Sequence, residues 1–73
     1  MATIPHYRRV LGENIRLIRK AAGLSQEKLA EKAELHPNYV GYVERGEQNI
    51  SVDALARVAR ALRVSMADLL KGA

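Results

Sequence analysis

Cysteine, tryptophan and phenylalanine are all absent from this sequence. Without cysteine the chain has no disulfide and no thiolate ligand for a metal. Without phenylalanine or tryptophan its core must be aliphatic, and the hydrophobic fraction of 48% is high enough to form one. No run of about 18 apolar residues could span a membrane, and the first residues lack the apolar core of a signal peptide. The sequence therefore predicts a cytoplasmic protein without a membrane segment.

The length of the chain bounds its architecture. Its 73 residues make one domain. A domain this small buries only about 60% of its unfolded surface, so its stability is marginal and a dimer would add to it. We expect a flexible N-terminal arm over residues 1–6 and a single domain over residues 7–73. Apolar residues recur there at helical spacing, which predicts a compact all-α fold.

The charge is basic overall but unevenly distributed. The net charge is +4, which favours a polyanionic partner. Residues 1–24 hold five cations and one carboxylate, and residues 51–73 hold four and two, whereas residues 25–50 hold three cations and five carboxylates. Attraction to phosphate in this central segment would have to come from Arg45, from helix N-termini and from the basic flanks.

Residues 25–46 have the pattern of two short helices joined by a tight corner at residues 34–36. Ser25 can accept a hydrogen bond from a free N–H at the start of the first helix. Pro37 opens the second helix, because a first helical position has no bond for its N–H to make. Gly46 ends that helix, where a left-handed residue suits glycine. The segment predicts a helix-turn-helix over about residues 25–45.

The second of these helices has two faces when its residues are placed about 100° apart. The face that must pack against the domain holds Val40, Val43 and Glu44. The opposite face, open to solvent or a partner, holds Asn38, Tyr42 and Arg45, with Tyr39 and Gly41 on its flanks. The Asn38 amide can pair bidentately with adenine in a major groove, and Arg45 can bind phosphate or guanine. Gly41 has no side chain, so a phosphate could approach its backbone closely.

Three motifs resemble the repressor/Cro-type helix-turn-helix family, also called the Xre family. They are Leu11-Gly12-x-x-Ile15-Arg16-x-Ile18-Arg19, Gly23-Leu24-Ser25-Gln26-Glu27-x-Leu29-Ala30 and Tyr39-Val40-x-x-Val43-Glu44-Arg45-Gly46. The resemblance covers about residues 10–70 and implies a five-helix, lambda-repressor-like DNA-binding domain. It further implies a transcriptional regulator that binds double-stranded DNA, typically as a homodimer on a palindromic operator, with residues 37–45 in the major groove.

The resemblance also implies roles for individual residues. Positions expected to contact bases are Gln26, Pro37, Asn38 and Tyr42, and positions expected to contact the DNA backbone are Ser25, Tyr39, Gly41 and Arg45. The family pairs Glu44 with an arginine of the first helix, and Arg19 matches that position. We therefore expect a partly buried ion pair between Arg19 and Glu44, with an architectural role.

Two departures from the family pattern stand out. Glu34 lies where the family usually has a corner glycine, so either Glu34 is left-handed, at about 1–2 kcal/mol, or the corner is built differently. Ile50 replaces a proline that many members have after the recognition helix. The run of residues 49–51 resembles the short controller proteins of restriction–modification systems, which tolerate that change.

The C-terminal third predicts two more helices. Ser51 caps the first of them, and Ser65 with Asp68 has the spacing of a capping box for the second. The outer side of the first helix carries Arg57, Arg60 and Arg63, which we expect to be a solvated face. Of Leu69 and Leu70, one is expected in the core. The other, with Val64 and Met66, forms a candidate dimer patch, for which a plain core role is an equal alternative; the candidates are Val64, Met66 and Leu70.

Other chemistry has little support in the sequence. His6 and His36 are thirty residues apart and form no metal-binding spacing. No glycine-rich phosphate loop is present, and the serines are better explained as caps. We therefore expect no catalytic residue, metal, cofactor or small-molecule ligand, and no enzyme. The alternative is an antitoxin or adaptor module of the same fold, whose partner protein would bind exposed Tyr39 and Tyr42.

Overall fold

The predicted all-α fold of five helices is confirmed. A computed structural model describes residues 3–73 and contains no strand in that part of the chain. Its helices are α1 (His6–Ala21), α2 (Gln26–Ala33), α3 (Pro37–Glu44), α4 (Val52–Leu62) and α5 (Met66–Leu69). Helix α3 ends one residue earlier than predicted, at Glu44. The helix-turn-helix is thus formed by α2 and α3.

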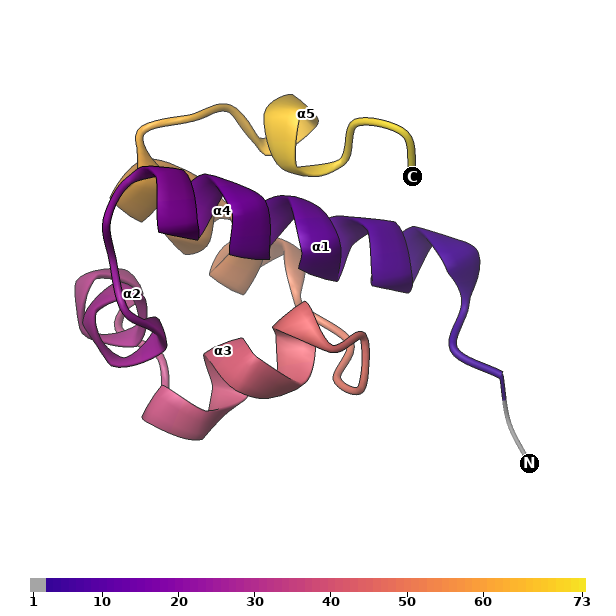
Figure 1. The fold of residues 1–73 in the computed structure, drawn as a ribbon, viewed down its shortest axis with the longest axis horizontal. Helices are drawn as coiled ribbons and strands as arrows, with labels where there is room; N and C mark the ends of the chain where they lie inside the picture. Colours follow the sequence, from indigo (N-terminus) through magenta and orange to yellow (C-terminus); the bar gives the residue numbers. More distant parts are fainter. Residues whose placement is uncertain (1–2) are drawn as a thin grey trace.

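The longest helix, α1, runs through the middle of the molecule (Figure 1). In this view α3 lies along one side of α1 and α5 along the other, while α4 lies behind it and α2 is seen nearly end-on. Helix α1 contacts both α3 and α5, and α2 contacts both α3 and α4. The core between the helices is aliphatic, as expected, and its largest fully buried side chains are Ile15, Leu29 and Leu69.

The helix starts follow the predicted capping. The Ser25 hydroxyl accepts a hydrogen bond from the Lys28 amide, and Ser51 and Ser65 cap α4 and α5 in the same way. Ser65 completes a reciprocal capping box with the N3 residue of α5. At the start of α3 the cap is His36, whose Nδ1 accepts from the Asn38 amide at 3.1 Å. These caps fix where each short helix begins.

Two non-glycine residues adopt left-handed backbone conformations, Glu34 with φ 56° and Arg63 with φ 59°. Glu34 ends α2 and Arg63 ends α4, and each donates its N–H to carbonyls of the last helical turn. The corner between α2 and α3 is therefore the left-handed corner that the family builds with glycine. Each residue destabilises the fold by about 1–2 kcal/mol relative to glycine.

Polar contacts between distant segments hold the helices together. The Asn14 side-chain amide donates to the backbone carbonyls of Leu69 and Lys71, at 2.9 Å each, and so ties α1 to α5. The Arg57 Nε donates to the Ala33 carbonyl at the end of α2, also at 2.9 Å. Arg57 was expected on a solvated face; that expectation is wrong, because this hydrogen bond joins α4 to α2.

The crossing of α1 with the end of α3 depends on Gly12. A Cβ at this buried position would lie 2.4 Å from the Val43 carbonyl oxygen and 2.6 Å from that of Glu44. Only glycine fits so close an approach of two backbones. Nearby, the side chain of Ile4 packs against Gly46, so Ile4 and Pro5 are half-buried. Residues 1–2 of the expected arm lie outside the described residues.

Candidate nucleic-acid interface

The two predicted faces of α3 are present in the structure. Val40 and Val43 are each 3% exposed and belong to the core. On the other face, Asn38, Tyr42 and Arg45 are all exposed. Pro37 is exposed beside them at the start of the helix. The polar side chains predicted to contact DNA therefore lie at the surface, while the valines next to them are hidden.

A buried ion pair anchors α3 to α1. Arg19 Nε lies 2.6 Å from one Glu44 carboxylate oxygen, and Arg19 Nη2 donates to the other at 3.1 Å. The side chains are only 9% and 2% exposed, respectively. A third donor, Gln26 Nε2, reaches Glu44 Oε1 at 2.9 Å, and Arg19 Nη1 donates to the Leu24 carbonyl. The pair predicted from the resemblance is thus present, and more deeply buried than expected.

Gln26 connects the two helices of the motif. Its side-chain amide donates to Glu44 from the first position of α2, and the residue is half-buried. Gly41 lies beneath it: a Cβ at Gly41 would meet Arg45 Nη1 at 3.2 Å and Gln26 Oε1 at 3.4 Å. The expectation of an open backbone at Gly41 is wrong, because these two side chains cover it. The absence of a side chain at Gly41 instead makes room for Gln26 and Arg45.

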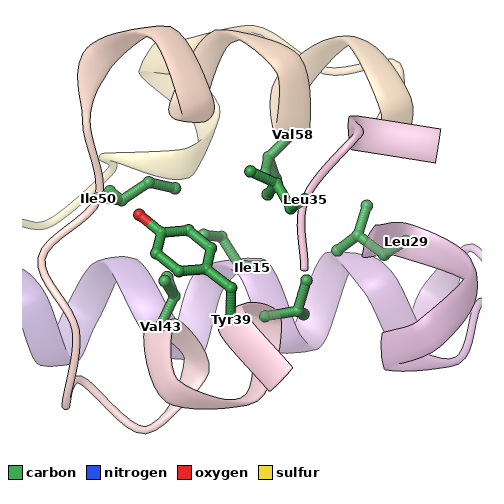
Figure 2. Close-up of a pocket in the computed structure, with 8 residues that line it drawn as sticks. Ile15, Leu29, Leu35, Tyr39, Val43, Ile50 and Val58 are labelled. Carbon is green, nitrogen blue, oxygen red and sulfur yellow. The ribbon is translucent and has the colours of Figure 1, made fainter. Parts of the chain in front are cut away.

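Tyr39 is less exposed than the sequence suggested. Figure 2 shows its ring among Ile15, Val43 and Ile50, facing the core. The small apolar cavity there has a volume of about 10 Å³, room for one water-sized guest at most. The Tyr39 hydroxyl donates to the Asn49 carbonyl at 3.1 Å and so fixes the loop after α3. The expected pair of exposed tyrosines is therefore reduced to Tyr42.

Arg45 is held over the exposed face of α3. Its guanidinium carbon lies 5.2 Å from the centre of the Tyr42 ring, a cation–π distance. Its Nε also donates to Glu47 at 3.0 Å. Glu44 and Glu31 have cationic partners as well, Arg19 and Lys28. Arg19 is the one cation among these that comes from outside residues 25–50, so it offsets one of the two excess carboxylates of that segment.

The N-terminus of α2 offers free backbone donors. Ser25 caps the amide of Lys28, but the amides of Gln26 and Glu27 make no hydrogen bond within the described residues. Unpaired N–H groups and the helix dipole together favour an anion such as a phosphate. At the start of α3, by contrast, His36 already accepts from the amides of Asn38 and Tyr39. The available anion site is thus at α2.

The candidate dimer residues differ in exposure. Leu69 is fully buried and Leu70 is 41% exposed, so Leu70 is the one that faces solvent. Val64 and Met66 are half-buried against the core. Leu17, which was not among the predicted candidates, is 54% exposed. Leu17 lies one turn from Asn14, the residue of α1 that binds α5, so it is on the same side of α1.

Residues 3–73 contain neither a membrane-spanning helix nor a metal-binding cluster. None of their helices combines the length and the apolar character needed to cross a bilayer. No three of their histidine, aspartate and glutamate side chains come together as a group that could hold a metal ion.

Comparisons with known proteins agree with this geometry. The helix-turn-helix family (HTH_3) matches residues 15–69. Control protein C.SmaI from Serratia marcescens is 46% identical over 61 residues, which cover 84% of this chain and 73% of that protein. The restriction-modification controller protein C.AhdI from Aeromonas hydrophila superposes with a TM-score of 0.82 at 41% identity, over 84% of this chain and 92% of that one. SinR, solved in complex with DNA, gives 0.79 at 39% identity, over 82% and 97%.

These matches include both helices of the motif and most of the chain. They confirm the resemblance drawn from the sequence, including the likeness to restriction–modification controller proteins. The named relatives are control and regulatory proteins. This protein therefore belongs to the helix-turn-helix family of DNA-binding transcriptional regulators.

Proposed function

We propose that this protein reads a specific DNA sequence with α3 in the major groove. The observation that carries the proposal is the orientation of α3, whose polar side chains are exposed while Val40 and Val43 are buried. In this arrangement Asn38 and Tyr42 contact base edges, with Pro37 at the helix start. Ser25 and the free amides of α2 bind a phosphate.

The roles of the remaining predicted residues follow from their contacts. Gln26 is held by Glu44, so its free carbonyl oxygen can accept from a base or from an ordered water. Arg45, tilted over Tyr42, binds the DNA backbone near the end of α3. Tyr39 can contact the DNA backbone only through the exposed edge of its ring, because its hydroxyl already donates to the Asn49 carbonyl.

We further propose that the protein acts as a homodimer on a palindromic operator. The partly exposed patch formed by Val64, Met66 and Leu70 supplies the contact between two copies. A two-fold dimer of this kind places its two recognition helices about 34 Å apart, on half-sites one helical turn apart. We expect this DNA-binding protein to act in the cytoplasm.

Selection of bound duplexes from a random library tests both parts of the proposal. We expect an enriched motif with two-fold symmetry. Asn38→Ala should then lower the affinity for the selected duplex by about 1–3 kcal/mol and relax preference at one base position. The affinity of that variant for duplexes altered at other positions is its internal control. A library that shows no enrichment would refute sequence-specific recognition.

Arg45→Ala tests the phosphate role. The variant should weaken binding to all duplexes alike and reduce the slope of log affinity against log salt by about one unit. Arg16→Ala is a matched control, because Arg16 is a partly exposed arginine of α1 whose ion pair, with Glu13, lies at the surface. A change in base preference for Arg45→Ala would make Arg45 a base reader. Weak, unselective duplex binding by the unaltered protein would instead favour the adaptor alternative.

A further inference from the structure

A basic hollow lies away from the exposed face of α3. We name it the α2–α4 cleft, because it is open to solvent between the C-terminal end of α2 and the second half of α4. Its volume is about 310 Å³, and the residues that line it are Lys32, Glu34, Arg57, Arg60, Ala61 and Arg63. Four cations against one carboxylate give the cleft a formal charge of +3, most of the +4 of the whole chain.

The cations of the cleft have no carboxylate partners. The ion pairs found in residues 3–73 all lie elsewhere in the fold. Arg57 is also held in place, because its Nε donates to the Ala33 carbonyl. A guanidinium has five N–H donors, so four donors of this oriented side chain remain for a ligand. The cleft thus presents positive charge that is partly preorganised and not internally neutralised.

Compensation of helix dipoles explains only part of this charge. Lys32 and Arg60 lie in the last turns of α2 and α4, where a cation is favourable for the helix itself. Arg63 caps the end of α4 and gains from the dipole too, but it does so in a left-handed conformation that glycine would adopt more easily. Glu34 is the other non-glycine residue of this kind, and it also lines the cleft. Backbone strain is therefore tolerated at two positions whose side chains line the cleft.

We propose that the α2–α4 cleft docks an acidic segment of a partner protein. Arginine guanidinium groups bind carboxylates in bidentate fashion, which suits aspartate and glutamate side chains. Glu34 favours a ligand that also brings hydrogen-bond donors, because its carboxylate lines the cleft and can accept them. A peptide backbone brings N–H groups, whereas a phosphodiester backbone brings none and would be repelled. The occupant favoured by this cleft is thus a peptide rather than a second stretch of nucleic acid.

The position of the cleft leaves the DNA-reading elements free. Helix α2 has eight residues, so its cleft end lies about 10 Å from the N-terminus that faces phosphate in the proposed complex. The exposed side chains of α3 do not line the cleft. An acidic partner can therefore bind while the protein occupies its operator, and the proposal does not depend on which operator that is.

Fluorescence anisotropy with a labelled poly-glutamate peptide tests the proposal, with a glycine–serine peptide of equal length as the neutral probe. The double variant Arg60→Gln, Arg63→Asn removes two charges from the cleft, and asparagine tolerates the left-handed position. The matched control is Lys20→Gln, Lys71→Gln, which removes two exposed charges elsewhere. Circular dichroism melts check that both variants fold, and duplex affinity is measured for each in parallel.

We expect the cleft variant to weaken poly-glutamate binding at least about tenfold, while the control variant changes it less than about twofold. Duplex affinity should be equal in the two variants. Equal loss of peptide binding in both variants would overturn the proposal, because general charge would then explain the binding. A selective loss of duplex affinity in the cleft variant would also overturn it, and would assign the cleft to the DNA track. Failure of the operator selection alone would leave this result intact.

Discussion

Removal of the Glu44 carboxylate offers the sharpest test of how the domain holds its recognition helix. Glu44 accepts hydrogen bonds from Arg19 and Gln26, and its side chain is 2% exposed. In Glu44→Ala, the buried Arg19 guanidinium keeps its bond to the Leu24 carbonyl but loses its counter-ion. Breaking one side of a buried pair in this way destabilises a protein by about 3–5 kcal/mol.

That loss is large for a chain of this size. A domain of 73 residues has a total stability of roughly 4–11 kcal/mol. A loss of 3–5 kcal/mol lowers the melting temperature by at least about 12 °C. Urea unfolding followed by circular dichroism measures the change directly, and an unchanged m-value would show that the variant still unfolds in two states.

The paired variant Arg19→Met, Glu44→Leu separates charge burial from packing. Replacing both members of a buried pair by apolar side chains is neutral or stabilising, by up to about 4 kcal/mol. We therefore expect the paired variant to be clearly more stable than Glu44→Ala. A loss of less than about 1 kcal/mol in Glu44→Ala would refute the reasoning, because the pair would then behave as a surface contact.

Three further changes probe separate features. Glu34→Gly removes left-handed strain and should stabilise the fold by about 1 kcal/mol. Its control, Lys32→Gly inside α2, should destabilise the fold by a similar amount. Urea unfolding in which the two variants shift the free energy of unfolding in the same direction would contradict this. Gly12→Ala should cost about 1–3 kcal/mol, since its Cβ would lie 2.4 Å from a carbonyl oxygen of α3, and an unaltered melting temperature would argue against so close a crossing. The Ser65 backbone amide lowers the pKa of Asp68 from 3.8, so the carboxylate stabilises the fold above that pH, and this contribution is lost as pH falls through the folded-state pKa. Asp68→Asn should therefore flatten the acid limb of a plot of melting temperature against pH, and an identical limb would place the acid sensitivity elsewhere.

Local signals in the sequence were enough for most of the architecture. Serine caps, a proline at a first helical position and glycine after α3 each act within one turn of the chain, and their effect can be read from neighbouring residues. The two faces of α3 followed from helical geometry alone. Val40 and Val43 lie on the same side of the helix, and so small a domain needs both of them in its core. The Arg19–Glu44 pair came from the family resemblance, since no local pattern joins residues 25 positions apart.

The features that the sequence did not predict depend on how helices meet. Asn14 reads as an ordinary polar residue of α1 until α5 brings two carbonyls to it across more than fifty residues. Gly41 lies on the predicted open flank of α3, and only the packing of α2 covers it with Gln26. Arg57 has the spacing of a surface residue and bonds to the end of another helix. Such contacts require the positions of two elements at once.

The arrangement around α1 has a consequence for operator choice. Gly12 and Asn14 are two residues apart on α1. Gly12 allows the close contact with α3, and Asn14 binds the C-terminal segment that carries Leu70. The distance between the groove-reading surface and the proposed contact between copies is therefore set by one helix, α1. Inserting a single base pair between half-sites rotates one of them by about 35°. We expect the proposed homodimer to bind such a lengthened operator more weakly, because α1 would have to bend for both recognition helices to stay in register.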